Sequence, residues 1–473
     1  IKSRYKLFTY DSFATFIENE YIANNRVVKD KIIIVDEAHN IRTMSNENSE
    51  KRVYATLSSC LESGINNRLV LLSATPMYNK SEDILDLMNL LLINDKRTHL
   101  LKHPFPSFFH ENKVEQKSID MMKQLASNYI SYLKGKNPFT FALKLSAKSF
   151  LSEKMEFLTH EFKKDQNNKL IKPSFKNWLS YIEDGILISH LGIKQRLFIN
   201  NEISQENDAG DDMDNTDEAK TQTKKQGDNG FNNLQPMNIV YDKFIGTNGF
   251  KTFFTRSDNS ASLVVNYNKQ YINALYPDSD HLGKYSGKFL QICNLIKNSK
   301  GVVVIYSSFI WSGVIPLAIC LEHMGFNREG GKNILNKPKI IQDAPNYNYK
   351  KSPKYCILSS HSEIMGSTNI DSLIKIINGP SNIDGADVKI ILMTPVASEG
   401  LSFFNVREMH IVEPWFHYNR VAQVIGRGIR NCRHQNLPLD ERNTTVFMHA
   451  SYDDDKKETA DIHAFRIASQ KRS

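Results

Sequence analysis

The sequence predicts an α/β protein with two lobes, each built on a parallel sheet, and a mostly helical insert between them. Short apolar runs of the kind found in buried parallel strands alternate with helical patterns before about residue 95 and again after about residue 285. The intervening stretch is mixed and mostly helical in pattern up to about residue 200. We therefore predict domains at 1–95, 96–284 and 285–473.

Two strands and one helix define the first lobe. "KIIIV" (31–35) and "RLVLLSAT" (68–75) are short apolar runs typical of buried parallel strands. Ser81 can cap a helix, because the apolar residues that follow it recur at helical spacing; they are Ile84, Leu85, Leu87, Met88, Leu91 and Leu92.

The second lobe is predicted from five strands and two helices. The strands are "GVVVIYS" (301–307), "KYCILSS" (354–360), "VKIILMT" (388–394), "EMHIVEP" (408–414) and "TTVFMHA" (444–450). The segment "FIWSGVIPLAICLEHMG" (309–325) predicts a helix that becomes regular at Pro316 and stops at Gly325. A second helix is expected over "HYNRVAQVIGRGIR" (417–430).

A polar tract at 201–236 divides the two lobes. It is rich in Asp, Asn, Gln and Gly and has almost no apolar residues, so we predict a disordered loop. Eight acids and no Lys or Arg lie between Glu202 and Glu218, whereas the whole chain has a net charge of +8. The rest of the chain therefore carries +16. A basic body suits a phosphate-rich partner, but the same charge also serves solubility.

Composition excludes some other classes of protein. The five cysteines contain no CxxC pair, which favours free thiols in a reducing compartment. No run approaches 18 uninterrupted apolar residues, so no membrane span is expected. The first residue is Ile and no secretory signal pattern follows, so we expect the sequence to begin inside a longer protein.

The first candidate site follows the strand at 31–35. Asp36 and Glu37 emerge at its carboxyl end, where ligands bind in open parallel sheets. One carboxylate there can hold Mg²⁺, usually through water, and the other can orient or deprotonate an attacking water. The alternative is that these acids only cap the next helix.

Further motifs follow in order along the chain. "LLSATP" (71–76) places Ser73 and Thr75 after the second strand, although Ser and Thr are also common caps. In "TPVASEGLSF" (394–403), Gly400 would let the backbone approach a phosphate or ribose, or it would simply serve a turn.

A basic helix completes the set of motifs. In "QVIGRGIR" (423–430), Arg427 and Arg430 are three residues apart and are predicted to share a helix face. Guanidinium groups can bind γ-phosphate oxygens and offset the charge that develops during phosphoryl transfer. The alternative is a solvated basic face, which does not explain the buried strands before it.

These motifs resemble those of superfamily 2 helicase-like ATPases, in which "DEAH" (36–39) is the Walker B signature. The chain is similar, more narrowly, to the helicase-like ATPases of nucleocytoplasmic large DNA viruses. That group includes poxvirus nucleoside triphosphate phosphohydrolase I and the small subunit of the poxvirus early transcription factor. The resemblance is carried by 71–92, 131–141, 299–326 and 408–438. The first of these stretches also resembles Swi/Snf-type translocases.

The resemblance implies two RecA-like lobes, with ATP between them and nucleic acid crossing both. Asp36 and Glu37 would serve Mg²⁺ and water, and His39 would link the ATP site to the third motif, Ser73 and Thr75. Glu399, Gly400 and Gln423 would bind the nucleotide, and Gln423, Arg427 and Arg430 would face the triphosphate. The segment "LFTYDSFATF" (7–16) is where contacts to the nucleic-acid backbone are expected.

One part of the family pattern is missing. A phosphate loop, G-x-x-x-x-G-K-[ST], is expected upstream of Asp36, yet residues 1–35 contain none. "GKYSGK" (283–288) has too few residues between its glycines, and "GTNGFKT" (246–252) lacks the Gly-Lys pair. We expect truncation of the first lobe rather than loss of activity, so this stretch alone would not hydrolyse ATP.

Two other stretches of the second lobe have two readings each. "EPWFHYN" (413–419) could stack bases, but packing of Trp415 and Phe416 between strand and helix is preferred. Arg433 and His434 could touch phosphates or lie at a solvated helix end.

Three functions are therefore expected in order. The first is an ATP-driven motor on DNA that works with a viral RNA polymerase or transcription-factor subunit, in the virion or host cytoplasm. The second is a strand-separating helicase for replication or repair. The third is a non-catalytic DNA-binding scaffold without a phosphate loop.

Overall fold

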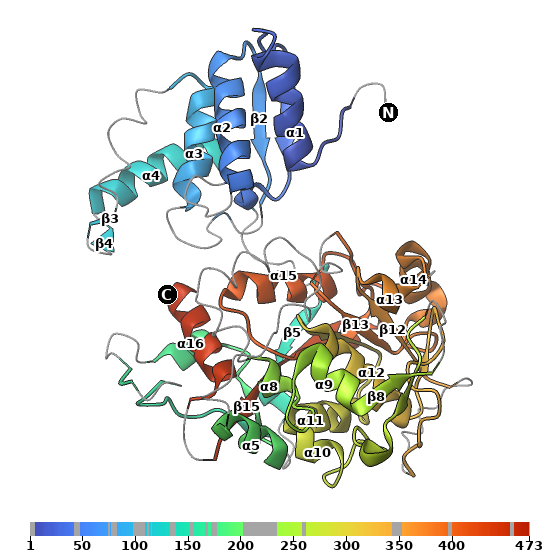
Figure 1. Ribbon diagram of the computed structural model, residues 1–473. Helices are drawn as coiled ribbons and strands as arrows, with labels where there is room; N and C mark the ends of the chain where they lie inside the picture. Colours follow the sequence, from blue (N-terminus) through green and yellow to red (C-terminus); the bar gives the residue numbers. More distant parts are fainter. Residues whose placement is uncertain are drawn as a thin grey trace. The chain divides into compact units, whose positions relative to one another are not determined.

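A computed structural model describes residues 5–41, 48–73, 76, 83–97, 109–110, 113–114, 116–132, 139–150, 155–165, 169–171, 177–201, 234–257, 262–342, 352–366, 368–395, 400–454 and 458–472. The chain forms two compact units, 1–135 and 136–473, which we call the first and second units. Each is described by itself (Figure 1).

The first unit is built on two parallel strands. β1 (Ile32–Val35) pairs with β2 (Arg68–Leu71), with Ile32 opposite Arg68 and Val35 opposite Leu71. The helices α1 (Tyr10–Ile17), α2 (Asn48–Ser63) and α3 (Asp83–Asn94) run alongside the strands (Figure 1). The unit also contains β3 (Phe109–His110), β4 (Lys113–Val114), α4 (Gln116–Tyr129), a π-helical turn (Glu18–Ile22) and a 3-10 turn (Ala38–Asn40).

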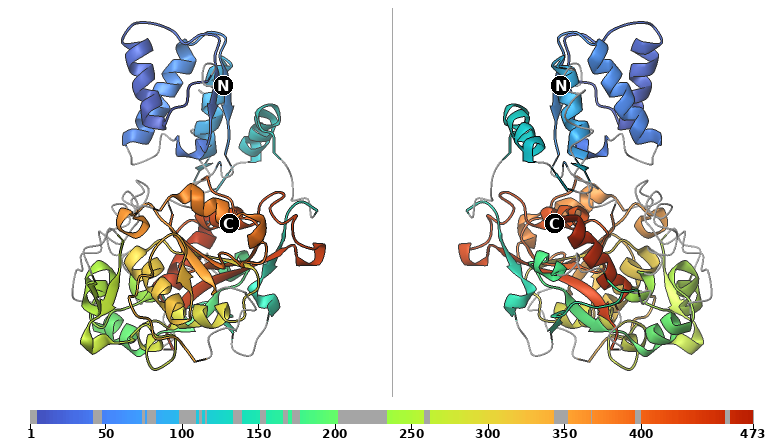
Figure 2. Two further views of the ribbon diagram at one scale, coloured as in Figure 1. Left: turned by 90° about the vertical axis from the view of Figure 1, so that its right-hand side faces the viewer. Right: turned by 90° about the vertical axis from the view of Figure 1, so that its left-hand side faces the viewer.

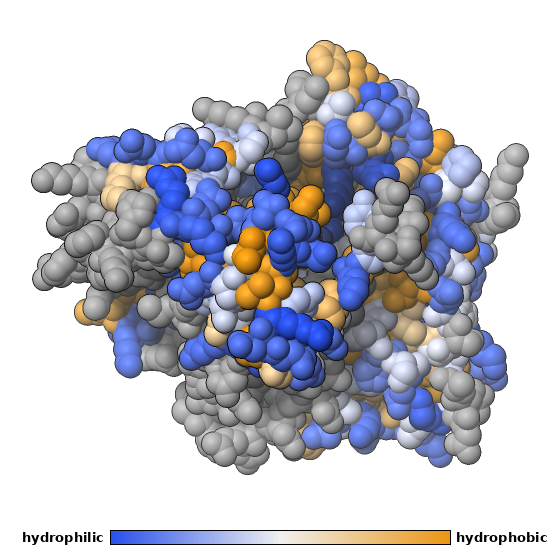
Figure 3. Space-filling model, turned by 90° about the horizontal axis from the view of Figure 1, so that it is seen from above, coloured by the Kyte–Doolittle hydropathy of each residue, from blue (hydrophilic) through white to orange (hydrophobic). Residues whose placement is uncertain are grey.

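The two faces of this small sheet differ in burial. Val35 packs with Ala14, Leu57 and Leu90 in the core of the unit, because alternate strand residues point to opposite faces. On the other face, Ile32 and Ile34 are 68% and 61% exposed, and Val70 and Leu72 are also exposed. Seen from above, hydrophobic residues reach the surface among hydrophilic ones (Figure 3). Parallel sheets are normally covered on both faces, so the second face of β1–β2 is unusual within the described residues.

The second unit contains a nine-stranded sheet. Its order is β11-β12-β13-β10-β14-β15-β7-β6, with β5 also paired to β15. All of its pairs are parallel except β6–β7. The strands are β5 (Leu143–Ser146), β6 (Glu156–Phe157), β7 (Leu187–His190), β10 (Val302–Tyr306), β11 (Asn327–Arg328), β12 (Lys354–Leu358), β13 (Ile390–Met393), β14 (Val406–Ile411) and β15 (Asn443–Tyr452).

Helices cover both faces of this sheet, as Figure 2 shows from two sides. Val302 and Val304 belong to one buried cluster with α14 (Ile370–Ile377), α15 (Tyr418–Gly428) and α16 (Ala460–Arg472). Val303 and Ile305, pointing the other way, belong to a second cluster with α9 (Gly246–Phe253), α11 (Gly287–Ile296) and α12 (Ile315–His323). This double covering confirms the predicted α/β class with parallel sheets.

Short elements complete the second unit. They are α5 (Ile193–Asn201), α8 (Gln235–Asn238), β8 (Phe254–Arg256), β9 (Val265–Tyr267), α10 (Leu282–Tyr285) and α13 (Ser362–Met365), with a π-helical turn at Ile310–Val314 and 3-10 turns at Ala147–Phe150, Trp178–Tyr181, Lys269–Tyr271, Pro380–Asn382 and Leu439–Glu441. Among the described residues, none of the helices is both long and apolar enough to cross a bilayer.

The predicted elements of the second lobe agree with the structure at most positions. All five predicted strands form, and α12 begins at Ile315 with Pro316 in its first turn. Gly325 follows α12 at a φ of +90°, a conformation that favours glycine. The backbone preceding α12 kinks at Ser312, so the apolar run 309–325 is not one regular helix.

The predicted loop at 201–236 ends too late. Residues 202–233 lie outside the described residues, but Leu234 is fully buried and Gln235 begins α8. Gln235 accepts a hydrogen bond from the Ser312 hydroxyl at 2.9 Å, so burial and this polar contact order the end of the tract.

Residues from the predicted insert also enter the second sheet. β5 and β7 both pair with β15, and β6 pairs with β7. The compact second unit accordingly begins at residue 136, whereas the predicted second lobe starts at 285. These strands have two to four residues each, too short to give a clear alternation in the sequence.

A buried histidine pair lies on the second sheet. His410 on β14 and His449 on β15 have their Nδ1 and Nε2 atoms 3.0 Å apart, and both side chains are fully buried. Burial holds the pKa of His449 well below its ordinary value, and His410 and Lys288 lower it further. Burial likewise lowers the pKa of His323 to about 4. The folded second unit therefore favours the neutral form of His449 and of His323.

We predict that His449 makes the second unit less stable in acid. Because its folded pKa is depressed, its contribution is present above the unfolded pKa of about 6.5 and is lost as the pH falls below it, by about 1.4 kcal/mol per pH unit. The measurement is urea unfolding between pH 7.5 and 5, followed by tryptophan fluorescence, because Trp178, Trp311 and Trp415 all lie in this unit.

His449→Gln should flatten the dependence of the unfolding free energy on pH, whereas His160→Gln, at an exposed position, should not. Comparing slopes is necessary because burial raises the pKa of Glu322 to about 7, and this group acts in the opposite direction. Parallel slopes for wild type and His449→Gln would contradict the prediction.

Candidate active site

The acid turn, Asp36 and Glu37, lies at the carboxyl end of β1 as predicted. Asp36 is exposed, and its Oδ1 accepts a hydrogen bond from the Glu37 N–H at 3.1 Å. Glu37 has φ 52° and ψ 46°, a left-handed conformation that costs a non-glycine residue roughly 1–3 kcal/mol. No α-helix begins at this turn, which continues into the 3-10 turn Ala38–Asn40 with no side-chain cap, so helix capping does not explain the acids.

The strand pairing brings the third motif to the same place. The Ala38 N–H donates to the Leu72 carbonyl at 2.9 Å, so the ends of β1 and β2 stay together. The Nδ1 atom of His39 lies 3.1 Å from Ser73 Oγ and 3.4 Å from Glu37 Oε2. His39 is 4% exposed, so its ring is fixed between the acid turn and Ser73. Thr75 lies outside the described residues.

In the second unit, the fifth and sixth motifs lie against each other. Arg427 Nη1 donates to the Leu401 carbonyl at 3.4 Å, and Arg430 Nη1 donates to Ser402 Oγ. The Phe403 N–H in turn donates to the Arg427 carbonyl at 3.1 Å. Both arginines are thus held next to the loop that follows Gly400.

Gly400 has the backbone geometry expected of a close-approach position. Its φ is +72°, and a Cβ added to it would meet nothing within 4 Å. Glycine is therefore required for conformation rather than for packing, and the backbone faces open space. Gln423 is half-buried on α15, and Glu399 lies outside the described residues.

The prediction that Arg427 and Arg430 share a helix face is wrong. α15 ends at Gly428, and Ile429 has non-helical angles of −104° and 88°. A Cβ on Gly428 would lie 2.6 Å from Met409 Sδ on β14, so the helix end sits tightly against the sheet. The chain turns there, and both arginines reach the 401–402 loop from helix and coil respectively.

An arginine that sequence reasoning missed anchors α15. Arg420 is 5% exposed, its Nε donates to the Tyr306 hydroxyl at 3.1 Å, and its guanidinium lies 4.1 Å from the centre of the Trp415 ring. Trp415 and Phe416 are themselves buried in the core, which confirms packing over base stacking. The sequence did contain a signal for Arg420. It precedes Gln423 and Arg427 by three and seven residues, a spacing that predicts one shared helix face.

For His434 both interpretations are wrong, because its side chain is buried. His434 is 1% exposed, with Nε2 2.8 Å from the Val406 carbonyl, and burial lowers its pKa. The Arg433 guanidinium lies 4.5 Å from the centre of the Phe404 ring. Both side chains fasten the segment after α15 to the sheet, a role that only the fold reveals.

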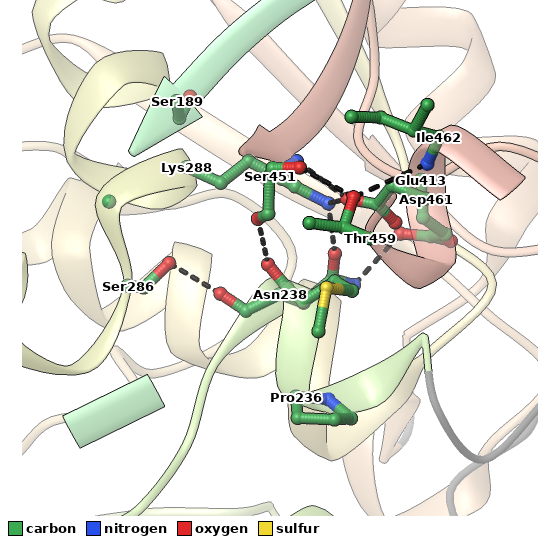
Figure 4. A network of polar contacts seen from close by, with 12 residues as sticks. Ser189, Pro236, Asn238, Ser286, Lys288, Glu413, Ser451, Thr459, Asp461 and Ile462 are labelled. Carbon is green, nitrogen blue, oxygen red and sulfur yellow. Dashed lines mark hydrogen bonds and ion pairs between the residues drawn. The ribbon is translucent and has the colours of Figure 1, made fainter. Parts of the chain in front are cut away.

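Lys288, the last residue of "GKYSGK", belongs to a buried polar network (Figure 4). Lys288 is fully buried, with Nζ 2.9 Å from Asn238 Oδ1 and 2.6 Å from Asp461 Oδ2. Asn238 Nδ2 donates to Glu413 Oε2 at 2.9 Å. This lysine is committed to protein carboxylates, so "GKYSGK" is not a phosphate loop. "GTNGFKT" forms most of α9 instead.

The network joins the carboxyl ends of three central strands. Glu413, after β14, accepts hydrogen bonds from the Ser307 hydroxyl at 3.0 Å and from the Ser308 N–H, both after β10. Asp461 accepts from the Ser451 N–H on β15 at 2.7 Å. Burial raises the pKa of Glu413 and of Asp461, although the charge of Lys288 acts to lower both. These hydrogen bonds to Glu413 therefore fix the start of the loop that leads into α15.

The acid turn offers oxygen ligands to a hard cation. Asp36 and Glu37 are two carboxylates at a sheet edge, and Mg²⁺ is usually held by one or two carboxylates with water and substrate phosphates. Among the described residues there is no group of three or more His, Cys, Asp or Glu that could hold a metal alone. Asp36 and Glu37 thus fit a Mg²⁺ ion that is also held by water and phosphate oxygens.

Comparison with known proteins shows what the chain is similar to. Residues 7–169 match the family model of the SNF2-related domain. These residues include the acid turn, His39 and Ser73. The chain is thus similar to helicase-like ATPases, as its motifs predict.

Relatives in large DNA viruses match most of the chain. A protein of Acanthamoeba polyphaga mimivirus, named as an ATP-dependent RNA helicase (R563), is 25% identical over 472 residues, covering 98% of this chain and 66% of its own length. A helicase-named protein (087L) of Invertebrate iridescent virus 3 is 22% identical and covers 100% of this chain and 41% of its own length. An African swine fever virus protein, the early transcription factor large subunit homolog, is 24% identical over 89% of this chain.

These relatives confirm the predicted resemblance to viral superfamily 2 helicase-like ATPases and support a viral origin. The African swine fever virus relative bears the name of the large subunit, whereas the prediction named the small one. The chain spans about two-fifths to two-thirds of the length of the relatives above. The ATPase core of a Sulfolobus solfataricus SWI2/SNF2 protein aligns over 93% of this chain with 13% identity and a TM-score of 0.25. The description of the fold therefore depends on the observed strand order and not on this alignment.

Proposed function

We propose that this chain is part of a nucleic-acid-dependent ATPase that translocates on DNA during viral transcription. The observation that carries the proposal is the contact of His39 with both Glu37 and Ser73, at 3.4 and 3.1 Å. It joins an acid turn suited to ATP hydrolysis to the motif that couples nucleotide state to nucleic acid in the resembled family.

In the proposed mechanism, Glu37 orients the attacking water and accepts its proton, and Asp36 would hold Mg²⁺, usually through water. Mg²⁺ supplies neutralisation of phosphate charge when it is bound. Arg427 and Arg430 offset the charge that develops on the γ-phosphoryl oxygens, and Gln423 and Gly400 contact the nucleotide. We propose that Glu399 and Thr75 contribute as their motifs imply.

DNA is the proposed track because the African swine fever virus relative is named as a transcription factor homolog. A viral RNA polymerase or transcription-factor subunit is then the proposed partner, in the virion or the host cytoplasm. RNA is the second candidate, because the mimivirus relative carries an RNA helicase name. Strand separation in replication or repair, and a non-catalytic scaffold, are the remaining alternatives.

The proposed function predicts a specific activity pattern for the full-length protein. ATP turnover should rise with duplex DNA, more than with RNA of equal length, and a forked duplex should not be separated. Phosphate release and strand displacement measure the two properties. Stimulation only by RNA would favour the second candidate, strand release would favour a helicase, and no turnover would favour the scaffold.

Glu37→Gln in the full-length protein should abolish turnover while ATP still binds, because the amide cannot accept the proton but keeps the shape of the side chain. Phosphate release and calorimetric ATP binding check the two halves of this expectation. Glu62→Gln, at an exposed position of the same unit, is the matched control. Normal turnover in Glu37→Gln would place the active site elsewhere.

Arg430→Ala should lower turnover by roughly 10³-fold or more, as for other arginines that contact a transferring phosphoryl group. The folded second unit should persist, because Arg430 is exposed and its protein contact is with Ser402. The control is Arg256→Ala, which removes another exposed arginine of the unit, paired with Glu363 at 3.6 Å. Equal turnover in the two variants would show that Arg430 does not act on the transferring phosphoryl group.

A further inference from the structure

Tyr10 makes a contact that its sequence position does not explain. It is the first residue of α1, in the segment 7–16 where nucleic-acid contacts are expected. Its hydroxyl instead donates toward the acid turn, reaching the main-chain carbonyl oxygens of Asp36 and Glu37, the second at 3.0 Å. One side chain therefore meets the backbone of both candidate catalytic acids, from 26 and 27 residues away.

The contacted turn is the strained part of the site. Glu37 has a φ of 52°, which side chains other than glycine rarely adopt. Rotation of this residue toward the ordinary helical or extended region would redirect its own carbonyl away from the Tyr10 hydroxyl. Since both carbonyls now converge on one hydroxyl, the Tyr10 contact selects the left-handed turn and with it the direction of the Glu37 side chain.

The hydroxyl is also well placed to act as a fixed point. The Tyr10 ring packs against the buried cluster of the first unit, and Thr9 caps α1. Glu18, which follows α1 and begins the π-helical turn, pairs with Arg52 of α2 at 2.6 Å. On the opposite side, the Ala38 N–H is held by Leu72 at 2.9 Å. The acid turn is thus held between α1 and β2.

We propose that Tyr10 is a positioning residue for Asp36 and Glu37. It touches neither substrate nor cation, and it acts by fixing the turn from which both carboxylates project. The inference rests on the proposed function and extends it, because it assigns the first residue of α1 to the ATP-hydrolysing step rather than to nucleic-acid binding.

The test is Tyr10→Phe in the full-length protein, which removes only the hydroxyl. We expect kcat to fall about tenfold, as for the loss of one hydrogen bond that positions the acid turn, while the KM for ATP and the nucleic-acid Kd stay within about twofold. Incorporation of p-aminophenylalanine at position 10 restores a donor and should recover most of the kcat. Tyr21→Phe is the control, because Tyr21 is half-buried in the same unit and packs its ring against Phe16.

Hydrogen exchange supplies a second readout that needs no turnover. The amides of residues 36–41 should exchange faster in Tyr10→Phe than in wild type or Tyr21→Phe. Unchanged exchange, or wild-type kcat in an active enzyme, would overturn the inference. A fall in nucleic-acid affinity with unchanged kcat, or a parallel loss of Tm, ATP affinity and kcat, would also overturn it. An inactive wild type would refute the proposed function. Hydrogen exchange at residues 36–41 would still show whether the Tyr10 hydroxyl stabilises the acid turn, because that measurement needs no turnover.

Discussion

Parallel pairing of strands is the constraint on which both candidate sites depend. Parallel strands end at a common edge, so residues that follow them become neighbours however far apart they are in sequence. In the first unit this places His39 beside Ser73, 34 residues later. In the second unit it places the loop after Gly400 and the end of α15 within hydrogen-bond distance. The chemistry follows from this edge rather than from any local motif.

The carboxyl edge of the second sheet is not open along its whole length. At the carboxyl ends of β10, β14 and β15, three buried charged side chains occupy it: Lys288, Asp461 and Glu413. Buried charges are tolerated when they are paired and hydrogen-bonded, as these are. This network closes the centre of the sheet edge. It supports the loop into α15, and Arg420 adds a second anchor through Tyr306 and Trp415. Gly400 remains at the edge, where a Cβ would meet nothing within 4 Å.

Sequence reasoning succeeded where the pattern was local. The buried strands of the second unit, the break at Gly325, and the placement of Asp36 and Glu37 at the end of a strand all follow from apolar runs and residue geometry. The strands β1 and β2 were also predicted to be buried, but one of their faces is exposed. It failed at Arg430, because the close approach of Gly428 to Met409 ends α15 early. It failed at His434 as well, since no local signal shows that this imidazole meets the Val406 carbonyl. The short strands β5, β6 and β7 were missed because two to four residues carry no readable period.

The sequence by itself determined the class of this protein, because the acids, the serine, the glycine and the arginines occur in one order after apolar strands. The tertiary structure alone decided how those residues are held. The Tyr10 hydroxyl donates to the carbonyl of the left-handed Glu37. The ring of His39 contacts both Glu37 and Ser73. Lys288 pairs with Asp461 and acts electrostatically on Glu413. The physical reason is that hydrogen bonds and burial act between residues that are distant in the chain, and only the packed fold brings those residues within bonding distance.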